Sequence, residues 1–401
     1  MPERGRGGAR LSPDARRILI AQGLRAFVYG LGSVLIGVSL ARQGLSGIEV
    51  GVLLAALLAG AALVSVALAR YADRVGRRRC YRLLLAGMAV AGTAFAVTDW
   101  LPALMLAALT GTVSTEVVES GPFTSLEQAM LPSTVDPNDT ARIFGTYNTI
   151  AALAGSLGAL AAGVPALLDV APQRLLLAYP VAVALALVAI RGLSRTVEAE
   201  SAREHGAAEP SLHRSQRIVG RLSVLFALDS FGGGFVTQAF IAYVFTRKYG
   251  ASPETLGAVF FAIGILQAVS FQAAVRLAHR IGLLRTMVFT HLPSNLLLAA
   301  IALAPTLAAA IALLLARSLL SQMDVPTRQA YVVAVVDPSE RTAAAAYTNT
   351  ARYVVRPVAP PLAGAALQVG LGAPFVIAGI LKSAYDVGLY ALFRKMPVDE
   401  R

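Results

Sequence analysis

Twelve long apolar runs, separated by short polar stretches, make up most of this 401-residue chain. A helix of about 20 apolar residues is long enough to cross the hydrocarbon core of a bilayer. Only 14% of the residues are charged, against about 25% in soluble proteins, so the chain lacks the polar surface that a water-soluble globule needs. The sequence therefore predicts an all-α membrane protein and excludes both a soluble enzyme and a disordered chain. The twelve predicted helices cover residues 18–40, 47–69, 81–98, 101–131, 141–166, 172–193, 219–245, 254–276, 284–303, 306–335, 341–369 and 371–393.

A polar segment at residues 194–218 divides the chain in the middle. It is rich in Arg, Glu and His and has few large apolar residues, which is typical of a solvated linker. Six predicted helices precede it and six follow it. We therefore expect an N-terminal six-helix half at residues 1–193 and a C-terminal six-helix half at residues 219–401, joined by a cytoplasmic linker.

Arginine-rich loops indicate how the helices are oriented. The chain carries a net charge of +12, which in a soluble protein would suggest a nucleic-acid partner. In a membrane protein, basic residues collect instead in the cytoplasmic loops. The arginine clusters at residues 74–82, 191–221, 276–285 and 394–401 fall on one side if twelve helices alternate. We therefore expect a multi-pass protein of the plasma (inner) membrane, with both termini in the cytoplasm and no nucleic-acid partner.

The two halves repeat each other in sequence. A shift of 206 residues places Gly44, Arg74 and Gly76 on Gly250, Arg280 and Gly282. A shift of 201 residues places Gln128, Asp136 and Asn148 on Gln329, Asp337 and Asn349. Matches of Arg, Gln, Asn and Asp-Pro are improbable by chance in so apolar a chain, so the halves are predicted to be a parallel structural repeat. Such repeats are a known transporter design, with the substrate site between the halves near the bilayer midplane.

The loop after the second predicted helix carries a recognisable motif. Residues 69–78 read Ala-Arg-Tyr-Ala-Asp-Arg-Val-Gly-Arg-Arg and resemble the loop motif G-x-x-x-D-R-x-G-R-R of the major facilitator superfamily, with Ala69 in place of the first glycine. The matching residues are Asp73, Arg74, Gly76 and Arg77. The resemblance implies twelve transmembrane helices in two pseudo-symmetric six-helix halves. It also implies that Asp73 faces the start of the eleventh helix in the outward-facing state.

The fifth predicted helix offers a second, weaker resemblance. Drug:proton antiporters of the superfamily carry G-x8-G-x3-G-P-x2-G-G there, and this chain keeps Gly145, Gly158 and Gly163 but has Ala159 in place of the proline. The pattern favours an exporter of the drug:proton antiporter branch. Ordinary packing of small residues between closely spaced helices explains the same pattern, and both interpretations stay open.

Ionisable residues inside a membrane are costly and are functional candidates by default. The fourth predicted helix carries Glu116, Glu119 and Glu127, and the tenth carries Arg317, Asp324 and Arg328. Each set has the spacing of a single helix face. The 201-residue shift places Glu116 on Arg317 and Glu127 on Arg328, so the repeat keeps the positions and inverts the charge.

In the superfamily these two helices lie on opposite sides of the central cavity, which predicts that Glu127 and Arg328 meet across it. Crowding of Glu116 and Glu119 in a region of low dielectric would suit one of them to carry a proton. Static salt bridges between helices are the alternative interpretation of the same residues.

Further ionisable residues in the predicted helices form three pairs: Arg25 with Asp229, Arg352 with Arg356, and Lys382 with Asp386. The first pair is a candidate for the cavity or its gate, with simple snorkelling to the interface as the alternative. The two arginines of the eleventh helix either neutralise an anion or hold the second helix or Asp73. The third pair is interpreted as a local ion pair on a peripheral helix.

No motif in the chain supports catalysis. It lacks a G-x-x-x-x-G-K-[ST] phosphate loop, its histidines lack metal-ligand spacing, and its single cysteine, Cys80, excludes an intrachain disulfide. We therefore expect no enzyme activity, no cofactor and no metal. The leading hypothesis is a monomeric secondary transporter in the lipid bilayer that exports a small organic compound in exchange for protons, by alternating access. The alternatives are a transporter of organic or phosphorylated anions bound by the intramembrane arginines, and a receptor or assembly factor that transports nothing.

Overall fold

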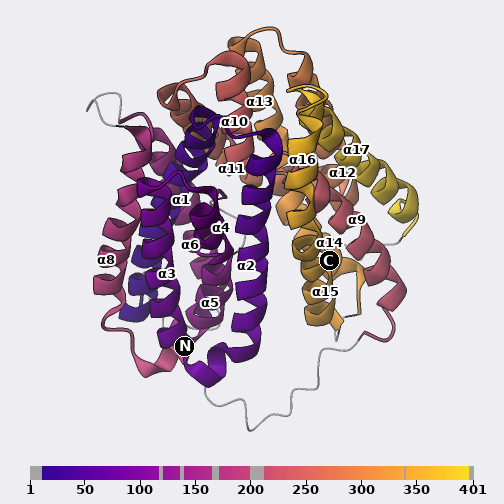
Figure 1. The fold of residues 1–401 in the computed structure, drawn as a ribbon. Helices are drawn as coiled ribbons and strands as arrows, with labels where there is room; N and C mark the ends of the chain where they lie inside the picture. Colours follow the sequence, from indigo (N-terminus) through magenta and orange to yellow (C-terminus); the bar gives the residue numbers. More distant parts are fainter. Residues whose placement is uncertain are drawn as a thin grey trace, which may run out of the picture.

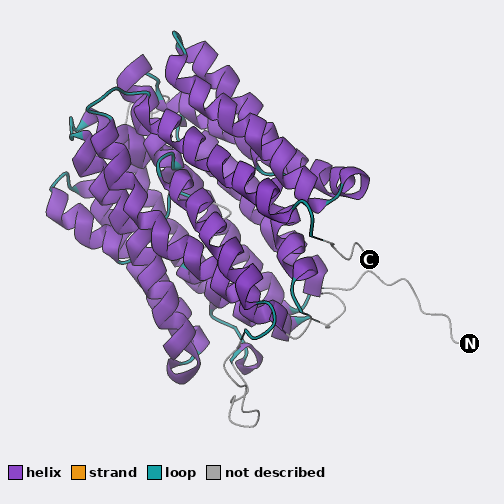
Figure 2. Ribbon diagram, turned by 90° about the vertical axis from the view of Figure 1, so that its right-hand side faces the viewer, coloured by secondary structure: helices purple, strands orange, loops and turns teal. Residues whose placement is uncertain are grey.

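A computed structural model of the chain describes residues 11–116, 121–135, 140–164, 171–198, 212–337 and 340–396. Within these ranges the regular structure is helical throughout (Figures 1 and 2). The N-terminal half contains α1 (Pro13–Arg42), α2 (Gly47–Val75), α3 (Arg77–Val97), α4 (Leu101–Leu109), α5 (Pro122–Met130), η1 (Leu131–Thr134), α6 (Thr140–Ala161), η3 (Pro172–Leu177), α8 (Ala178–Ile190) and η4 (Arg195–Val197). The C-terminal half contains α9 (Gln216–Gly234), α10 (Gln238–Tyr249), α11 (Pro253–Ile281), α12 (Leu283–Ala300), η5 (Ile301–Leu303), α13 (Leu307–Ser321), α14 (Asp324–Val335), α15 (Arg341–Val355), η7 (Arg356–Val358), α16 (Ala359–Ala366) and α17 (Ala373–Phe393).

The predicted twelve-span organisation is confirmed in outline. Ten helical segments of the described residues are long and apolar enough to cross a membrane. The other two predicted spans, residues 101–131 and 341–369, are present as the pairs α4 with α5 and α15 with α16, and each is interrupted in the middle. Two of the ten long segments, Gln216–Tyr249 and Leu307–Val335, also contain a short break.

Four predicted spans, over residues 101–131, 219–245, 306–335 and 341–369, are interrupted near their centres, where the sequence predicts a proline kink in three of them. Proline accounts for three of the breaks. Pro122, Pro326 and Pro360 lie in the first turn of α5, α14 and α16. A proline has no N–H to donate to the preceding turn and its ring clashes with the carbonyl there, so it begins a helix well and continues one badly. The fourth break, between α9 and α10, follows three consecutive glycines at 232–234.

The repeat seen in the sequence is present in the backbone. Gly44 and Gly250, 206 residues apart, have φ angles of 71° and 65° after α1 and α10. Gly76 and Gly282, also 206 apart, have φ angles of 97° and 87° between α2 and α3 and between α11 and α12. Residues with a Cβ rarely adopt such positive φ values. The two halves therefore make the same tight turns at equivalent places, as a pseudo-symmetric fold requires.

The halves meet most closely at one end of the bundle. We call the end that holds η4 and the start of α9 the linker end, and the end that holds Gly44 and Gly250 the far end. Near the far end α2 packs against α16, α1 against α10, and α6 against α11 (Figure 1). A Cβ built on Gly364 of α16 would lie 2.0 Å from the carbonyl oxygen of Gly47 on α2. Backbone from the two halves is thus in direct contact at the far end.

Candidate functional site

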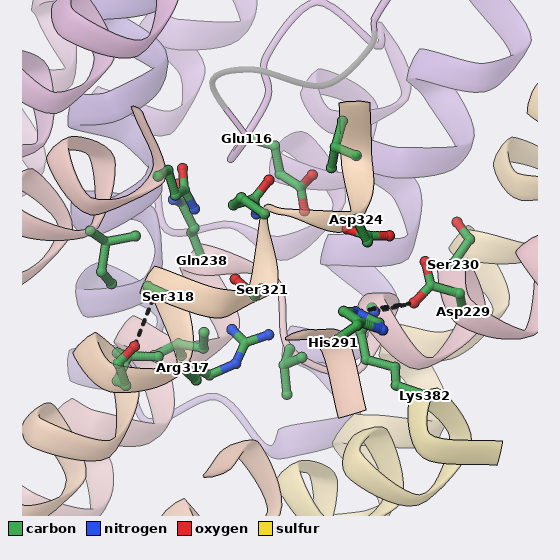
Figure 3. Close-up of a pocket in the computed structure, with 18 of the residues that line it drawn as sticks. Glu116, Asp229, Ser230, Gln238, His291, Arg317, Ser318, Ser321, Asp324 and Lys382 are labelled. Carbon is green, nitrogen blue, oxygen red and sulfur yellow. Dashed lines mark hydrogen bonds and ion pairs between the residues drawn. The ribbon is translucent and has the colours of Figure 1, made fainter. Parts of the chain in front are cut away.

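A polar cavity of about 200 Å³ lies between the two halves (Figure 3). Most of its wall comes from the C-terminal half, and Glu116 contributes from the N-terminal half. The described part of this wall includes five cationic and three acidic side chains, a net charge of +2 without any proton on histidine. They are Arg317, Arg328, Arg352, Arg356, Lys382, Glu116, Asp229 and Asp324. Seven of these residues were predicted from the sequence as cavity or proton-coupling residues, and Lys382 was not.

Arg317 is the cavity cation that forms no hydrogen bond or ion pair with another described side chain. It lies on α13 and is partly buried, next to Ser318 and Ser321, which also line the cavity. No hydrogen bond or ion pair joins its side chain to another described residue, and its Nε is buried without a hydrogen-bond partner. A guanidinium without an acceptor is costly in a region of low dielectric. The arrangement therefore leaves one positive charge available to a ligand in the cavity.

Glu116 and Arg356 form an ion pair that joins the two halves. Arg356 begins η7, at the break between α15 and α16, and Glu116 lies in the non-helical stretch after α4. This stretch is held by a bond from the Glu116 N–H to the Ser114 hydroxyl at 3.0 Å. The expectation that Glu116 shares a helix face with Glu127 is therefore wrong, because Glu116 itself lies outside the helices of this span. Glu119 lies outside the described residues.

A second, mostly apolar cavity of about 260 Å³ adjoins the first, between α2 and α15. Leu57, Leu58 and Val66 of α2 and Val354 of α15 contribute to its wall. Glu116 and Arg356 line both cavities. The ion pair between the halves therefore separates a charged space from an apolar one.

Glu127 lies inside the N-terminal half, away from Arg328. Its side chain is 0% exposed. Arg25 Nη2 donates to one carboxylate oxygen at 2.6 Å, Tyr147 donates to the same oxygen at 2.5 Å, and Tyr81 donates to the other at 2.6 Å. The predicted contact between Glu127 and Arg328 across the cavity is therefore wrong, as is the predicted pairing of Arg25 with Asp229. Glu127 and Arg25 neutralise each other within the N-terminal half.

Asp229 of α9 is the centre of a matching network in the C-terminal half. It accepts from Lys382 Nζ of α17, and from Arg328 Nη1 at 3.3 Å. Arg328 also bonds Asp324 one helical turn away on α14, at 3.0 Å. The i, i+4 spacing of Asp324 and Arg328 thus produces an ion pair, as expected for residues on one helix face. The predicted local pair of Lys382 with Asp386 is wrong, because Lys382 points to Asp229 in the cavity wall.

Asp386 pairs instead with His291, a residue that sequence reasoning missed. His291 is on α12, and its Nδ1 lies 3.0 Å from Asp386 Oδ1. Asn295 donates to Asp386 at 2.8 Å. The sequence did contain a signal for this site, because His291 lies in the middle of an apolar run, where an ionisable residue is a functional candidate. The spacing of the four histidines, which indicates no metal site, does not reveal this signal. Among the described residues no group of His, Cys, Asp and Glu is arranged to hold a metal ion.

The motif loop forms a contact other than the one implied by its resemblance. Asp73 is 54% exposed and pairs with Arg77 at 2.8 Å, within the same loop. Arg77 also donates to the carbonyl of Ala129 at 2.8 Å, which fixes the loop against the end of α5. Arg74 is exposed, and Gly76 supplies the positive φ between α2 and α3. In this conformation Asp73 is thus engaged by its own loop and not by the eleventh span.

The glycines of the fifth span, α6, differ in what surrounds them. A Cβ on Gly158 would lie 1.8 Å from the carbonyl oxygen of Phe27 on α1, and one on Gly163 would lie 3.2 Å from Glu254 Cα of α11. A Cβ on Gly145 would meet nothing within 4 Å. Two of the three glycines therefore allow close helix packing, inside the half and between the halves.

Comparisons with known proteins agree with this architecture. The family model described as Major Facilitator Superfamily matches residues 18–360. An uncharacterized membrane protein of Saccharomyces cerevisiae, YJR124C, is 25% identical over 422 aligned positions, which cover 95% of this chain and 94% of that protein.

Solved structures share the fold at low identity. The nucleoside transporter NupG matches with a TM-score of 0.75 at 12% identity, covering 95% of this chain and 99% of that one. A D-xylose-proton symporter matches with a TM-score of 0.71 at 14% identity, covering 94% and 97%. The human organic anion transporter MFSD10 matches with a TM-score of 0.61 at 16% identity, covering 94% and 99%. These proteins are named for different classes of substrate, so the structural similarity identifies the fold and does not identify a ligand.

Proposed function

This chain belongs to the Major Facilitator Superfamily and is a membrane transporter of that fold, and we propose that its substrate is a small organic anion, moved by alternating access. The single observation that carries the proposal is Arg317. Its guanidinium is in the wall of the central cavity and has no acceptor among the described residues. A carboxylate, sulfonate or phosphate group would supply two acceptor oxygens to such a planar donor.

The charge of the described wall supports the same substrate class. Five cationic and three acidic side chains line the described part of the cavity. Two of the cations, Arg328 and Lys382, already bond to Asp229. An anion at Arg317 would therefore enter a field that is positive overall without needing to break the internal ion pairs.

The packing of the halves supports a conformation closed at the far end. Gly364 and Gly47 bring α16 and α2 into backbone contact there, and the Tyr243 hydroxyl of α10 donates to the Leu45 carbonyl at 3.0 Å. The arginine-rich loops are at the linker end, which by the positive-inside rule is cytoplasmic. We propose that this conformation exposes the site to the cytoplasm. Rocking of the halves, with release of the Glu116–Arg356 pair, would expose it to the other side.

The proposal is tested by exchange of radiolabelled anions in proteoliposomes. The panel holds mono- and dicarboxylates, sulfonates and organophosphates, with neutral and cationic compounds beside them. We expect saturable exchange with an anion. Arg317→Gln should raise the half-saturating concentration by about 10- to 100-fold, since a hydrogen bond to a charged group contributes about 1.5–3 kcal/mol. The matched control is Arg285→Gln, at an exposed position at the start of α12, which should leave exchange unchanged. Saturable flux of a neutral or cationic compound that Arg317→Gln leaves intact would overturn the proposal.

A second candidate function is proton-coupled export of a small organic compound, with Glu116 or Glu119 as the proton carrier. The observation in its favour is that Glu116 lines the cavity and pairs across the halves with Arg356, so its charge is linked to their separation. Glu116→Gln should then abolish proton-driven flux and spare exchange. Unchanged driven flux would remove Glu116 as the coupling residue. Saturable flux of any kind would exclude the receptor hypothesis.

A further inference from the structure

His291 is held between two carboxylates in the C-terminal half. Its Nδ1 lies 3.0 and 3.1 Å from the two oxygens of Asp386, and its Nε2 lies 3.8 Å from Asp229 Oδ1. The imidazole is 3% exposed and the Asp386 carboxylate is 0% exposed. Its ring also meets the ring of Tyr385, with centroids 5.8 Å apart. The histidine is thus fixed in position, with a carboxylate on each side.

Asp386 has no arginine or lysine among its bonded partners in the described structure. It accepts from His291 and from the amide of Asn295. An ionised carboxylate buried with only neutral partners is strongly disfavoured. The pair of His291 and Asp386 therefore retains a proton while it is sealed from water, whichever of the two carries it.

The charges of the five described carboxylate and cationic side chains that bond one another around His291 lead to the same result. The cluster contains three carboxylates and two permanent cations, namely Asp229, Asp324, Asp386, Arg328 and Lys382. A proton on His291 brings its total to zero, and loss of that proton leaves one buried negative charge. His291 is therefore the member whose protonation decides whether the cluster is neutral.

The two ring nitrogens have separate roles. Nδ1 is within hydrogen-bond distance of both Asp386 oxygens, so it donates its N–H to that carboxylate whenever Asp386 is ionised. Nε2 faces Asp229, whose Oδ1 is shared with Lys382. The position at which a proton arrives and leaves is therefore Nε2.

His291 itself lines the central cavity. His291, Asp229 and Lys382 all line that cavity, together with Arg317 (Figure 3). Four helices contribute charged or titratable groups near the imidazole. These groups are Asp229 of α9, Arg317 of α13, Asp324 and Arg328 of α14, and Lys382, Tyr385 and Asp386 of α17. The neighbouring helix α11 contributes Phe260, Ile263 and Gln267 to the cavity wall.

We propose that His291 is the proton-binding residue of this transporter and that the proton travels with the anion, in the same direction. A proton from water on one side binds Nε2 to form the imidazolium, and the same proton is released to water on the other side after the halves have moved. An anion in the cavity stabilises the imidazolium, and the imidazolium stabilises the anion by the same free energy. This inference rests on the proposed anionic substrate and adds the site and the direction of proton coupling.

The experiment follows internal pH in proteoliposomes with an enclosed pH dye while a gradient of the exchanged anion is applied. Inward anion flux should acidify the interior of vesicles with the wild-type protein. His291→Asn should reduce this acidification to the level of protein-free liposomes, and its residual anion exchange should lose its dependence on pH. His279→Asn is the matched control, because His279 is exposed at the end of α11. It should acidify as the wild type does.

A second variant addresses the risk that His291→Asn misfolds. Asp386→Asn keeps the imidazole and removes the carboxylate that holds it, so the pH at which exchange is half-maximal should move to a lower value. Three results would overturn the inference: anion exchange in the wild type without proton movement, alkalinisation in place of acidification, or undiminished acidification with His291→Asn in folded protein. In all three the anion site stands, whereas absence of any anion flux would overturn the proposed function and this inference together.

Discussion

Replacement of Glu127 by glutamine tests the network that the structure places inside the N-terminal half. The Glu127 carboxylate is 0% exposed and accepts from Arg25, Tyr81 and Tyr147, at distances of 2.5 to 2.6 Å. Arg25 is itself 5% exposed and lies over the rings of Tyr29 and Phe123. Its guanidinium therefore has no route to water if the carboxylate is neutralised.

The expected loss of stability follows from this burial. Breaking a buried ion pair by removing one partner costs about 3–5 kcal/mol, because the remaining charge stays buried and uncompensated. Glutamine keeps one acceptor oxygen for the tyrosines, which places the expected effect near the lower limit, at about 3 kcal/mol. Arg25→Met should cost a similar amount, because it leaves the Glu127 carboxylate with only the two hydroxyl donors. The double variant should cost less than the sum, since neither charge remains.

The assay is thermal unfolding of the purified protein in detergent, for the wild type, both single variants and the double variant. Arg70→Met is the matched control, because Arg70 is exposed on α2. It should leave the free energy of unfolding within about 0.5 kcal/mol of that of the wild type. Strictly additive losses in the double variant would refute the claim that Arg25 and Glu127 neutralise each other.

Three further predictions follow from individual contacts. Exchanging the charges of Glu127 and Arg328 should not rescue transport, because each residue pairs within its own half; recovery of flux in the exchanged variant would show that they meet across the cavity. Gly364→Ala should slow transport without unfolding the protein, because the new Cβ would lie 2.0 Å from the Gly47 carbonyl oxygen and would hold the two halves apart at the far end. The control Gly370→Ala, whose Cβ would meet nothing within 4 Å, should transport normally. Equal transport rates for the two variants would contradict the far-end contact. The backbone N–H of His213, with those of the next two residues, lowers the pKa of Glu340 to about 2 from its ordinary 4.5. The stability that Glu340 contributes is therefore present above pH 4.5 and is lost as the pH falls towards 2. Glu340→Gln should make the unfolding midpoint less dependent on pH over that interval, and an unchanged dependence would contradict the assignment.

The architecture was predictable because it depends on local properties of the chain. The length of an apolar run decides whether a helix can span a bilayer, and this gave twelve spans with a polar segment between two halves. The turn glycines Gly44 and Gly250 were predicted to be equivalent from their 206-residue separation, and their φ angles agree. The i, i+4 pair of Asp324 with Arg328 was likewise predictable from the sequence, because both residues are on one short helix.

The partners of the other charges were not predictable, because they lie on different helices. The charge-inverted repeat suggested that Glu127 faces Arg328, yet the buried space around Glu127 is closed by Arg25 and two tyrosines. The continuous fourth and tenth helices assumed for that alignment are interrupted at Pro122 and before Pro326. A break of one turn redirects every side chain beyond it, so spacing along the sequence no longer reports a shared face.

The sequence by itself determined that this chain is a twelve-span membrane protein with a repeated half, since hydrophobic length, glycine turns and arginine-rich loops act over a few residues at a time. Only the tertiary structure decided that Arg317 has no acceptor among the described residues, that Glu116 joins the halves through Arg356, and that His291 lies between Asp386 and Asp229. The physical reason is that the free energy of a charge in the membrane depends on which side chains surround it within a few ångströms, and those neighbours come from helices far apart in the chain.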